Sequence, residues 1–313
     1  MAKNYNVPKI EELLDAGVHF GHQVRRWNPK MEPYIYSVKK NIHVIDLEET
    51  HKGLKNACEF LYETAAKGGQ IVLVGTKRQA RDIVALEAAR CGALHITERW
   101  LGGTITNYRM IKQSIDRLVD LKRKREAGEL KRYTKKERLL IDREIEKLEK
   151  SVGGLVALKG QPDVVVVIDV RREKTAVRES NMYKVPVVAL VDTNSNPTGV
   201  KYVIPGNDDA IKSIAVLVKA ISDAIEAGYK DFAKNAEKAV SKVDKKDTLK
   251  KTVDKVEEVE EVEIPADAVE VDVKEDVEEE QVKVVVDEVL EVKEAKEDDS
   301  KKTKTAKKTS KKK

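Results

Sequence analysis

Two histidines stand three positions apart in the segment HFGH, as His19 and His22. Imidazole nitrogens are common zinc ligands, so this spacing makes a metal site one interpretation. No cysteine or acidic residue stands close to them in sequence, and Gly21 between them suits a turn. We therefore expect these histidines to hydrogen-bond backbone or to contact RNA, and we expect no metal site.

A phosphate-binding loop is a second kind of chemistry to consider, because residues 75–78 (GTKR) follow an apolar run and precede a helical pattern. Backbone N–H groups at the start of a helix attract anions, and Lys77, Arg78 and Arg81 add positive charge. The Walker spacing GxxxxGK[ST] is absent, and no GxGxxG follows an expected strand. A phosphate contact and a plain strand-to-helix turn both fit the segment, and neither requires a nucleotide cofactor.

Residues 192–199 (DTNSNPTG) also follow an apolar run, which is where α/β enzymes place catalytic loops. Asn, Asp, Pro and Gly are equally the residues of a long surface turn. No His, Cys or second acid lies near this segment in sequence to form an acid–base couple. We interpret it as a structural turn, and the sequence predicts no catalytic residue.

Cations next to an aromatic residue indicate a different chemistry in residues 25–30 (RRWNPK). Cations neutralise phosphates, and aromatic rings stack on unpaired bases. The chain has only two tryptophans, Trp27 and Trp100, and each follows an arginine. We expect Arg25, Arg26 and Lys30 to contact phosphates and Trp27 to stack, although tryptophan is also a common core residue.

The stretch RWLGGTITNYR, residues 99–109, surrounds two glycines with cations and aromatic residues. Gly102 and Gly103 would allow the backbone to approach RNA closely or to bend sharply. Arg99 and Arg109 would then bind phosphates. Trp100 would either stack on RNA or pack at the base of the helices that follow, and both alternatives remain open.

The pattern of residues 104–152 predicts two charged helices joined around residues 128–133. Thr134 and Glu137 form the pattern of a capping box at the start of the second helix. Apolar residues spaced by three and four positions form a narrow stripe on each helix, which favours an antiparallel coiled-coil hairpin that projects from the rest of the chain. Residues 153–154 (GG) would return the chain to the main domain.

The expected free end of this hairpin carries the densest positive charge of the region that precedes the C-terminal tail. A projecting basic tip is typical of a probe for the phosphate backbone, and Tyr133 beside it is a candidate for stacking. The expected phosphate contacts at the tip are Lys122, Arg123, Lys124, Arg125, Lys131, Arg132, Lys135 and Lys136.

Outside the hairpin, short β-branched runs alternate with helical patterns. Uninterrupted Val and Ile runs at 71–74, 164–168 and 187–191 indicate strands buried on both faces, as in a parallel sheet between two layers of helices. We predict a doubly wound α/β domain formed by residues 1–103 and 153–235. Its other expected strands are 34–37, 42–45, 94–96 and 202–204, and its expected helices are 8–16, 47–67, 77–91, 172–183 and 207–227.

The net charge of +5 conceals three regions of opposite sign. Residues 1–240 carry 42 basic and 32 acidic residues, a balance of +10, whereas residues 241–300 carry 10 and 23, and residues 301–313 carry eight lysines and no acid. We expect residues 236–313 to be a disordered, low-complexity tail, because they offer too little apolar surface to order the chain. Two cysteines, no apolar run of membrane-spanning length and no signal-peptide pattern predict a cytoplasmic protein with reduced thiols.

Several long motifs resemble one family. The segments LDAGVHFGH at 14–22, WNPKM at 27–31 and RWLGG at 99–103 are similar to the bacterial ribosomal protein S2 family. The resemblance continues through PVVALVDTN at 186–194 and VIPGNDDAI at 203–211, and it covers about residues 5–230 in unbroken order. The acidic and lysine-rich end of the chain lies beyond it.

The resemblance implies a Rossmann-like domain with a coiled-coil hairpin, in a non-enzymatic protein of the small ribosomal subunit. It implies binding to 16S ribosomal RNA near the junction of head and body, contact with neighbouring small-subunit proteins, and retention of ribosomal protein S1 where that protein is present. No cofactor is implied beyond magnesium that accompanies RNA, and no membrane. Two alternatives remain from the residues alone: a cytosolic nucleotide-binding α/β enzyme, and a coiled-coil scaffold that grips a protein.

Overall fold

The computed structural model describes residues 5–253, with side chains described as far as residue 235 except that of Lys131. The chain divides into two compact units, residues 1–232 and 233–313. The first unit contains the sheets and the helical hairpin, and of the second only the helical continuation of α7 (Ile211–Val253) is described. None of the helices in the described part combines the length and apolar character that crossing a bilayer requires.

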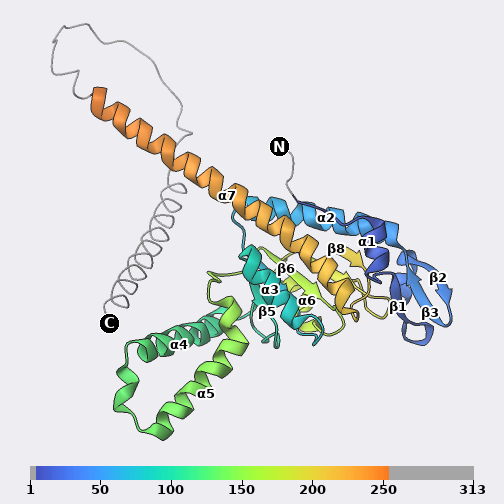
Figure 1. The fold of residues 1–313 in the computed structure, drawn as a ribbon, viewed down its shortest axis with the longest axis horizontal. Helices are drawn as coiled ribbons and strands as arrows, with labels where there is room; N and C mark the ends of the chain where they lie inside the picture. The colour runs from blue at the N-terminus through green and yellow to red at the C-terminus, as the bar shows by residue number, and fades with distance from the viewer. Residues whose placement is uncertain (1–4, 254–313) are drawn as a thin grey trace, which may run out of the picture. The chain divides into compact units, whose positions relative to one another are not determined.

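A parallel five-stranded sheet is the centre of the first unit (Figure 1). Every residue of its three central strands is buried, which confirms the prediction drawn from their uninterrupted Val and Ile runs. In order across the sheet, the strands are β5 (Leu94–Ile96), β4 (Ile71–Val74), β6 (Val164–Ile168), β7 (Val187–Val191) and β8 (Tyr202–Pro205).

Helices cover both faces of this sheet, as predicted. Alternate residues of each strand point into two separate apolar clusters. The first cluster is closed by α1 (Ile10–Asp15), α2 (Leu47–Ala66), α3 (Arg81–Cys91) and α7. The second is closed by α6 (Lys174–Met182) and by the base of the hairpin. The hairpin is therefore anchored in the core of the sheet domain rather than attached by a bare linker.

The first three strands form an antiparallel sheet of their own, β1 (Phe20–Gln23), β3 (Ile42–Ile45) and β2 (Ile35–Lys39) in spatial order. Strands were predicted at 34–37 and 42–45, but their separation from the parallel sheet was not predicted. β1 was not predicted at all, since Gly21 and two histidines suggested a turn. Two short 3-10 helices, Val24–Arg26 and Pro29–Tyr34, connect β1 to β2.

Two helices, α4 (Tyr108–Glu126) and α5 (Lys135–Val152), form the predicted hairpin (Figure 1). The capping box is present, because the Thr134 hydroxyl accepts from the Glu137 N–H while the Glu137 carboxylate accepts from the Thr134 N–H. Ion pairs join the helices at Arg117–Glu144 (3.2 Å) and Lys122–Glu149 (2.6 Å). Coiled-coil packing of the seam stays a prediction.

Helix boundaries differ from the predicted ones in three places. The helix expected from residue 77 begins at Arg81, and that expected from residue 207 begins at Ile211, because the intervening side chains make the contacts described below. Helix α7 continues to Val253, so the predicted start of a tail at residue 236 falls inside a helix. Residues 236–253 include six lysines, and lysine has high helix propensity. The rest of the predicted tail, residues 254–313, lies outside the described residues.

Candidate nucleic-acid interface

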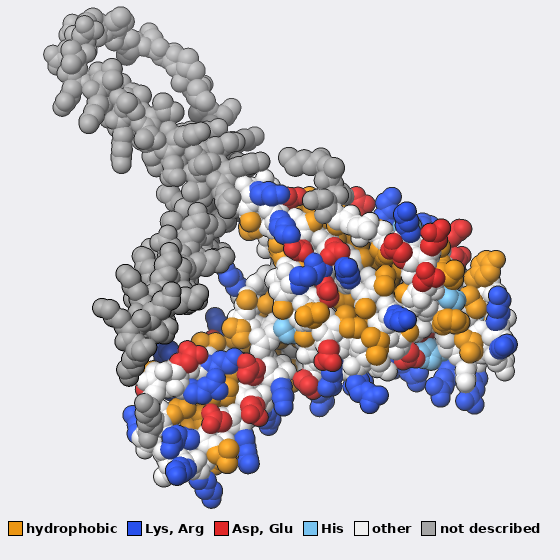
Figure 2. Space-filling view, in the orientation of Figure 1, with side chains coloured by type: hydrophobic (Ala, Val, Ile, Leu, Met, Phe, Trp, Pro, Cys, Tyr) orange, Lys and Arg blue, Asp and Glu red, His pale blue; other side chains and the backbone are white. Residues whose placement is uncertain are grey.

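A basic hollow of about 1010 Å³ lies where three segments of the first unit meet. One is the short helix Val24–Arg26, the second is α6 with the loop before it, and the third is the loop after β7. Five cations line it: Arg25, Arg26, Arg171, Lys174 and Arg178. In Figure 2, Lys and Arg side chains gather along the lower edge of the sheet domain and at the free end of the hairpin.

None of these five cations forms an ion pair with another described residue, and no Asp or Glu lines the hollow. Arg90 in α3 shows the contrast, since its guanidinium lies 2.5–2.6 Å from carboxylates of Glu87, Asp223 and Glu226. Like charges repel when they converge without counter-ions. The hollow therefore has the electrostatic character of an anion-binding site.

The segment that carries Arg25 and Arg26 is tied to the loop after β7. The Asn28 N–H donates to the Thr193 carbonyl at 2.8 Å, and the Lys30 ammonium donates to the Thr198 hydroxyl at 2.7 Å. The His22 N–H donates to the Thr193 hydroxyl at 2.8 Å. The loop 192–199 thus has the structural role predicted for it, and it holds two cations of the hollow in place.

Arg25, Arg26 and Lys30 were predicted from the sequence, and the structure exposes all three. Trp27 lies outside the lining of the hollow and is half-buried, with its ring centroid 5.4 Å from that of His43. Arg171, Lys174 and Arg178 were missed. The segment that holds them, RREKTAVRES, also contains Glu173 and Glu179, so in sequence it looked like an ordinary solvated helix of mixed charge.

The two acids in that segment are both buried, which leaves the cations alone at the surface. Glu173 accepts a hydrogen bond from the Thr76 hydroxyl. Glu179 accepts from the N–H groups of Gly103 (2.8 Å), Ile105 (3.2 Å) and Thr106 (3.4 Å). The loop at the base of the hairpin therefore closes around a carboxylate of the protein itself.

This contact changes the interpretation of the stretch 99–109. Gly103 adopts a left-handed φ of +96°, which suits glycine, and its amide faces Glu179 rather than solvent. Trp100 is 5% exposed and packs in the second core cluster, so the structure favours its role at the hairpin base over stacking. Gly102 and the side chains of Arg99 and Arg109 are exposed.

The cations of the hairpin tip fall into two groups. Lys122 pairs with Glu149, and Arg123 and Lys124 pair with Asp120 at 2.9 and 2.6 Å. Tyr133 is 38% exposed, and the Arg132 guanidinium lies 5.5 Å from its ring centroid. Exposed tip cations that form no ion pair with a described residue are Arg125, Arg132, Lys135 and Lys136.

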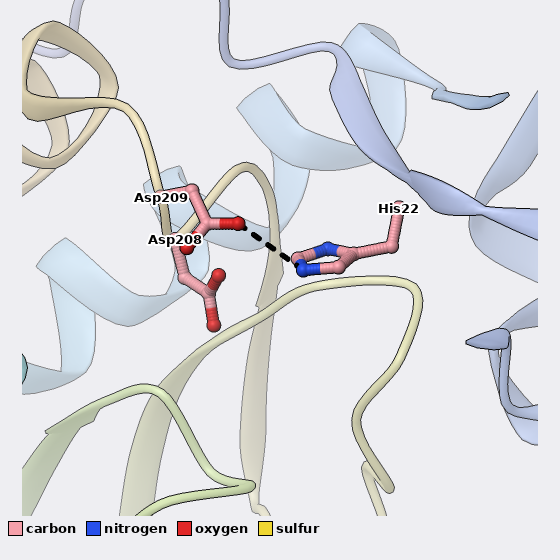
Figure 3. A group of neighbouring side chains, drawn as sticks. All are labelled: His22, Asp208 and Asp209. Atoms are coloured by element: carbon pink, nitrogen blue, oxygen red, sulfur yellow. Dashed lines mark ion pairs between the residues drawn. The ribbon is translucent and has the colours of Figure 1, made fainter.

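A network of charges lies at the carboxyl ends of the parallel strands, as Figure 3 shows in part. His22 bridges two carboxylates, with Nδ1 3.0 Å from Asp192 and Nε2 3.1 Å from Asp209. The Lys77 ammonium lies 2.8 Å from Asp208 and 2.6 Å from Asp209. No acid–base couple was predicted near residue 192, and this was wrong in space, because the partners come from β1 and from the loop after β8.

The network shifts the pKa values of its members. The hydrogen bond to Asp192, with the charges of three carboxylates, raises the pKa of His22 against the effect of burial. Burial, together with the nearby charges of Asp192 and Asp169, raises the pKa of Asp208 to about 7 despite its pair with Lys77. Burial lowers the pKa of Lys77, but its carboxylate partners outweigh burial and raise it.

Lys77 was predicted to bind a phosphate, but its side chain is 13% exposed and is held by this network. Arg78 next to it is exposed. His22, Asp208 and Asp209 bring ligand atoms within 4.8 Å of one another, the donor set that a divalent metal would use. An ammonium already lies among these oxygens, so we propose that the site holds no resident metal.

Known proteins are similar to this chain in amino-acid sequence. The family model described as Ribosomal protein S2 matches residues 13–228. The small ribosomal subunit protein uS2 of Maridesulfovibrio salexigens is 45% identical over 249 residues, which cover 76% of this chain and 96% of the relative. That of Francisella tularensis subsp. novicida is 50% identical over 216 residues, which cover 69% and 90%. These matches confirm the resemblance, and the chain belongs to the structural, non-enzymatic ribosomal protein S2 family.

Proposed function

We propose that this chain is a structural component of the small ribosomal subunit and binds 16S ribosomal RNA through two basic surfaces. One surface is the basic hollow, and the other is the exposed end of the hairpin. The observation that carries the proposal is the convergence of five cations without counter-ions on the hollow. RNA phosphates would supply the missing negative charge.

Phosphate contacts would fix the position of the protein on folded RNA, and most of the binding free energy would come from release of counter-ions. The protein would act in subunit assembly and translation in the cytoplasm, next to neighbouring small-subunit proteins. Retention of ribosomal protein S1, where that protein is present, belongs to the proposal on the family resemblance alone.

Sedimentation tests this function. Full-length tagged protein from lysate would be separated on a sucrose gradient with and without ribonuclease, and each fraction would be probed for the tag. We expect co-migration with intact small subunits and release by ribonuclease or high salt. Migration as a free protein, under conditions that keep the subunits intact, would contradict the proposal.

A further inference from the structure

We propose that the basic hollow binds the sugar-phosphate backbone of double-helical RNA without reading its base sequence. This inference rests on the proposed function and assigns a ligand chemistry to one of its two surfaces. Three independent features of the lining support it: its charge, the direction of its hydrogen-bonding groups and its lack of aromatic side chains.

The charge of the lining selects an anionic ligand with more than one negative group. Arg25 and Arg26 come from the short helix Val24–Arg26, whereas Lys174 and Arg178 lie four positions apart on α6 and share one face of that helix. Since no carboxylate lines the hollow, a ligand that carries a single charge would leave most of these cations uncompensated. A run of phosphates satisfies several of them at once.

Three of the four asparagines of the lining already use their amide oxygen as an acceptor within the protein. The amide oxygen of Asn28 accepts from the Lys30 N–H (3.0 Å), and that of Asn196 accepts from the Thr198 N–H (3.1 Å). The amide oxygen of Asn194 accepts from the neighbouring Ser195 hydroxyl (2.9 Å). Each bond uses one acceptor position of an amide oxygen, and none of the three NH₂ groups donates to another described residue. Arginine, lysine and amide NH₂ groups together match phosphate and ribose oxygens, which accept hydrogen bonds.

Recognition of unpaired bases would use stacking surfaces that the lining does not offer. The Watson–Crick edge of every unpaired base mixes donors with acceptors, and proteins that bind unpaired bases stack them on aromatic rings. The lining includes no aromatic side chain. Trp27, the nearest tryptophan in sequence, packs toward His43, and Trp100 is buried. Paired RNA, whose bases are stacked internally and whose phosphates face outward, fits this lining better than a single strand.

Binding of synthetic RNA to the full chain tests the inference. The probes are an RNA hairpin of about 16 base pairs, a length that known double-stranded RNA-binding domains span, the same stem with shuffled pairs, and oligouridine of equal length. The variant is Lys174→Ala/Arg178→Ala. The matched control is Lys55→Ala/Lys219→Ala, which also removes two exposed positive charges, on α2 and α7.

We expect the Lys174→Ala/Arg178→Ala variant to bind both hairpins roughly tenfold more weakly than the parent. The slope of log affinity against log salt should fall by about one for each phosphate contact removed. The control should stay within about twofold of the parent, because its cations lie outside the proposed site. Circular dichroism and thermal melting of both variants verify that they fold.

Two results would overturn the inference while leaving the proposed role in the small ribosomal subunit intact. One is unchanged hairpin binding by the folded variant, which would place the RNA elsewhere on the protein. The other is tighter binding of oligouridine than of the hairpins, lost in the variant, which would make the hollow a single-strand site. Failure of the parent protein to bind any probe and to sediment with small subunits would overturn the proposed function as well.

Discussion

The carboxylate of Glu179 accepts a hydrogen bond from the backbone N–H of Gly103 at 2.8 Å. This contact joins α6 to the double-glycine loop from which the hairpin starts. The same helix presents Lys174 and Arg178 to the basic hollow. One short helix therefore positions part of the proposed RNA site on its exposed side and the base of the hairpin on its buried side.

Replacement of Glu179 by alanine should loosen the hairpin base. The change leaves the N–H groups of Gly103 and Ile105 without their acceptor inside the protein. An unsatisfied buried donor costs about 1–3 kcal/mol, so we expect the free energy of unfolding to fall by roughly 2–4 kcal/mol. Denaturant titration measures it. The control is Thr175→Ala, an exposed position on the same helix, and an equal loss in both variants would refute the anchoring role.

His22, which bridges Asp192 and Asp209, should make the free energy of unfolding depend on pH. Because its carboxylate partners raise the pKa of His22 above the ordinary 6.5, its stabilising effect is complete below pH 6.5 and is lost as pH rises through the folded-state pKa. Asp208, whose pKa is raised to about 7 from 3.8, acts in the same direction, since its contribution is lost as pH rises between those values.

We therefore expect the melting temperature to fall between pH 6 and pH 8.5, and to fall less steeply in His22→Gln. The variant His95→Gln supplies a comparison of opposite sign, because burial lowers the pKa of His95 and its contribution is lost as pH falls. Thermal melting from pH 5 to pH 8.5 measures the slopes, and the part of this range below pH 6.5 is where His95 acts. Identical slopes in the parent and in His22→Gln would contradict the prediction.

The parts of the fold that could be predicted are those that depend on residues close together in sequence. Residues 164–168 and 187–191 are unbroken β-branched runs, and only a strand buried on both faces suits them. The hairpin was predictable because a capping box and a periodic apolar stripe are both local signals. Strand β1 was not, because FGHQ has neither alternation nor an apolar run, and its place depends on pairing with β3.

The candidate site was only half predictable for a related reason. Arg25 and Arg26 stand in a segment without acids, whereas Lys174 and Arg178 share theirs with Glu173 and Glu179. Burial of the two acids separates the charges, and burial is a property of the fold. The Lys77 network has the same origin, since its carboxylates come from loops far apart in sequence that meet where parallel strands end.

Two neighbouring cations should respond differently to truncation. Lys77→Ala removes the ammonium shared by Asp208 and Asp209, and breaking a buried pair by removing one partner costs about 3–5 kcal/mol. Arg78 is exposed, so Arg78→Ala should change stability by less than about 0.5 kcal/mol. Denaturant titration of both variants distinguishes the two positions. A small effect of Lys77→Ala would mean that the network does not need its lysine.

Gly154, where the chain leaves the hairpin and returns to the sheet, has no room for a side chain. A Cβ at Gly154 would overlap the backbone oxygen of His95 in β5, and backbone cannot move as a flexible side chain does. Overpacking of this kind costs about 1–3 kcal/mol or more, so Gly154→Ala should lower the melting temperature measurably. Gly160→Ala is the matched control, because nothing lies within 4 Å of its added Cβ. Equal melting of the two variants would contradict the close approach.

The hairpin tip offers a comparison between free and paired cations. Arg125, Lys135 and Lys136 form no ion pair with a described residue, whereas Lys122, Arg123 and Lys124 pair with Glu149 or Asp120. A cation that already faces a carboxylate has less positive potential to offer a phosphate. The triple alanine variant of the free set should therefore weaken binding to the RNA hairpin more than that of the paired set, and should lower the salt slope by up to about three.

Binding measured at several salt concentrations gives both quantities for the two triple variants. Equal losses would mean that total charge at the tip matters and that its internal ion pairs do not. No loss in either variant would remove the tip from the RNA-binding surface. The alternative of a hairpin that grips a protein along its apolar residues would then be favoured, because such an interface does not depend on these charges.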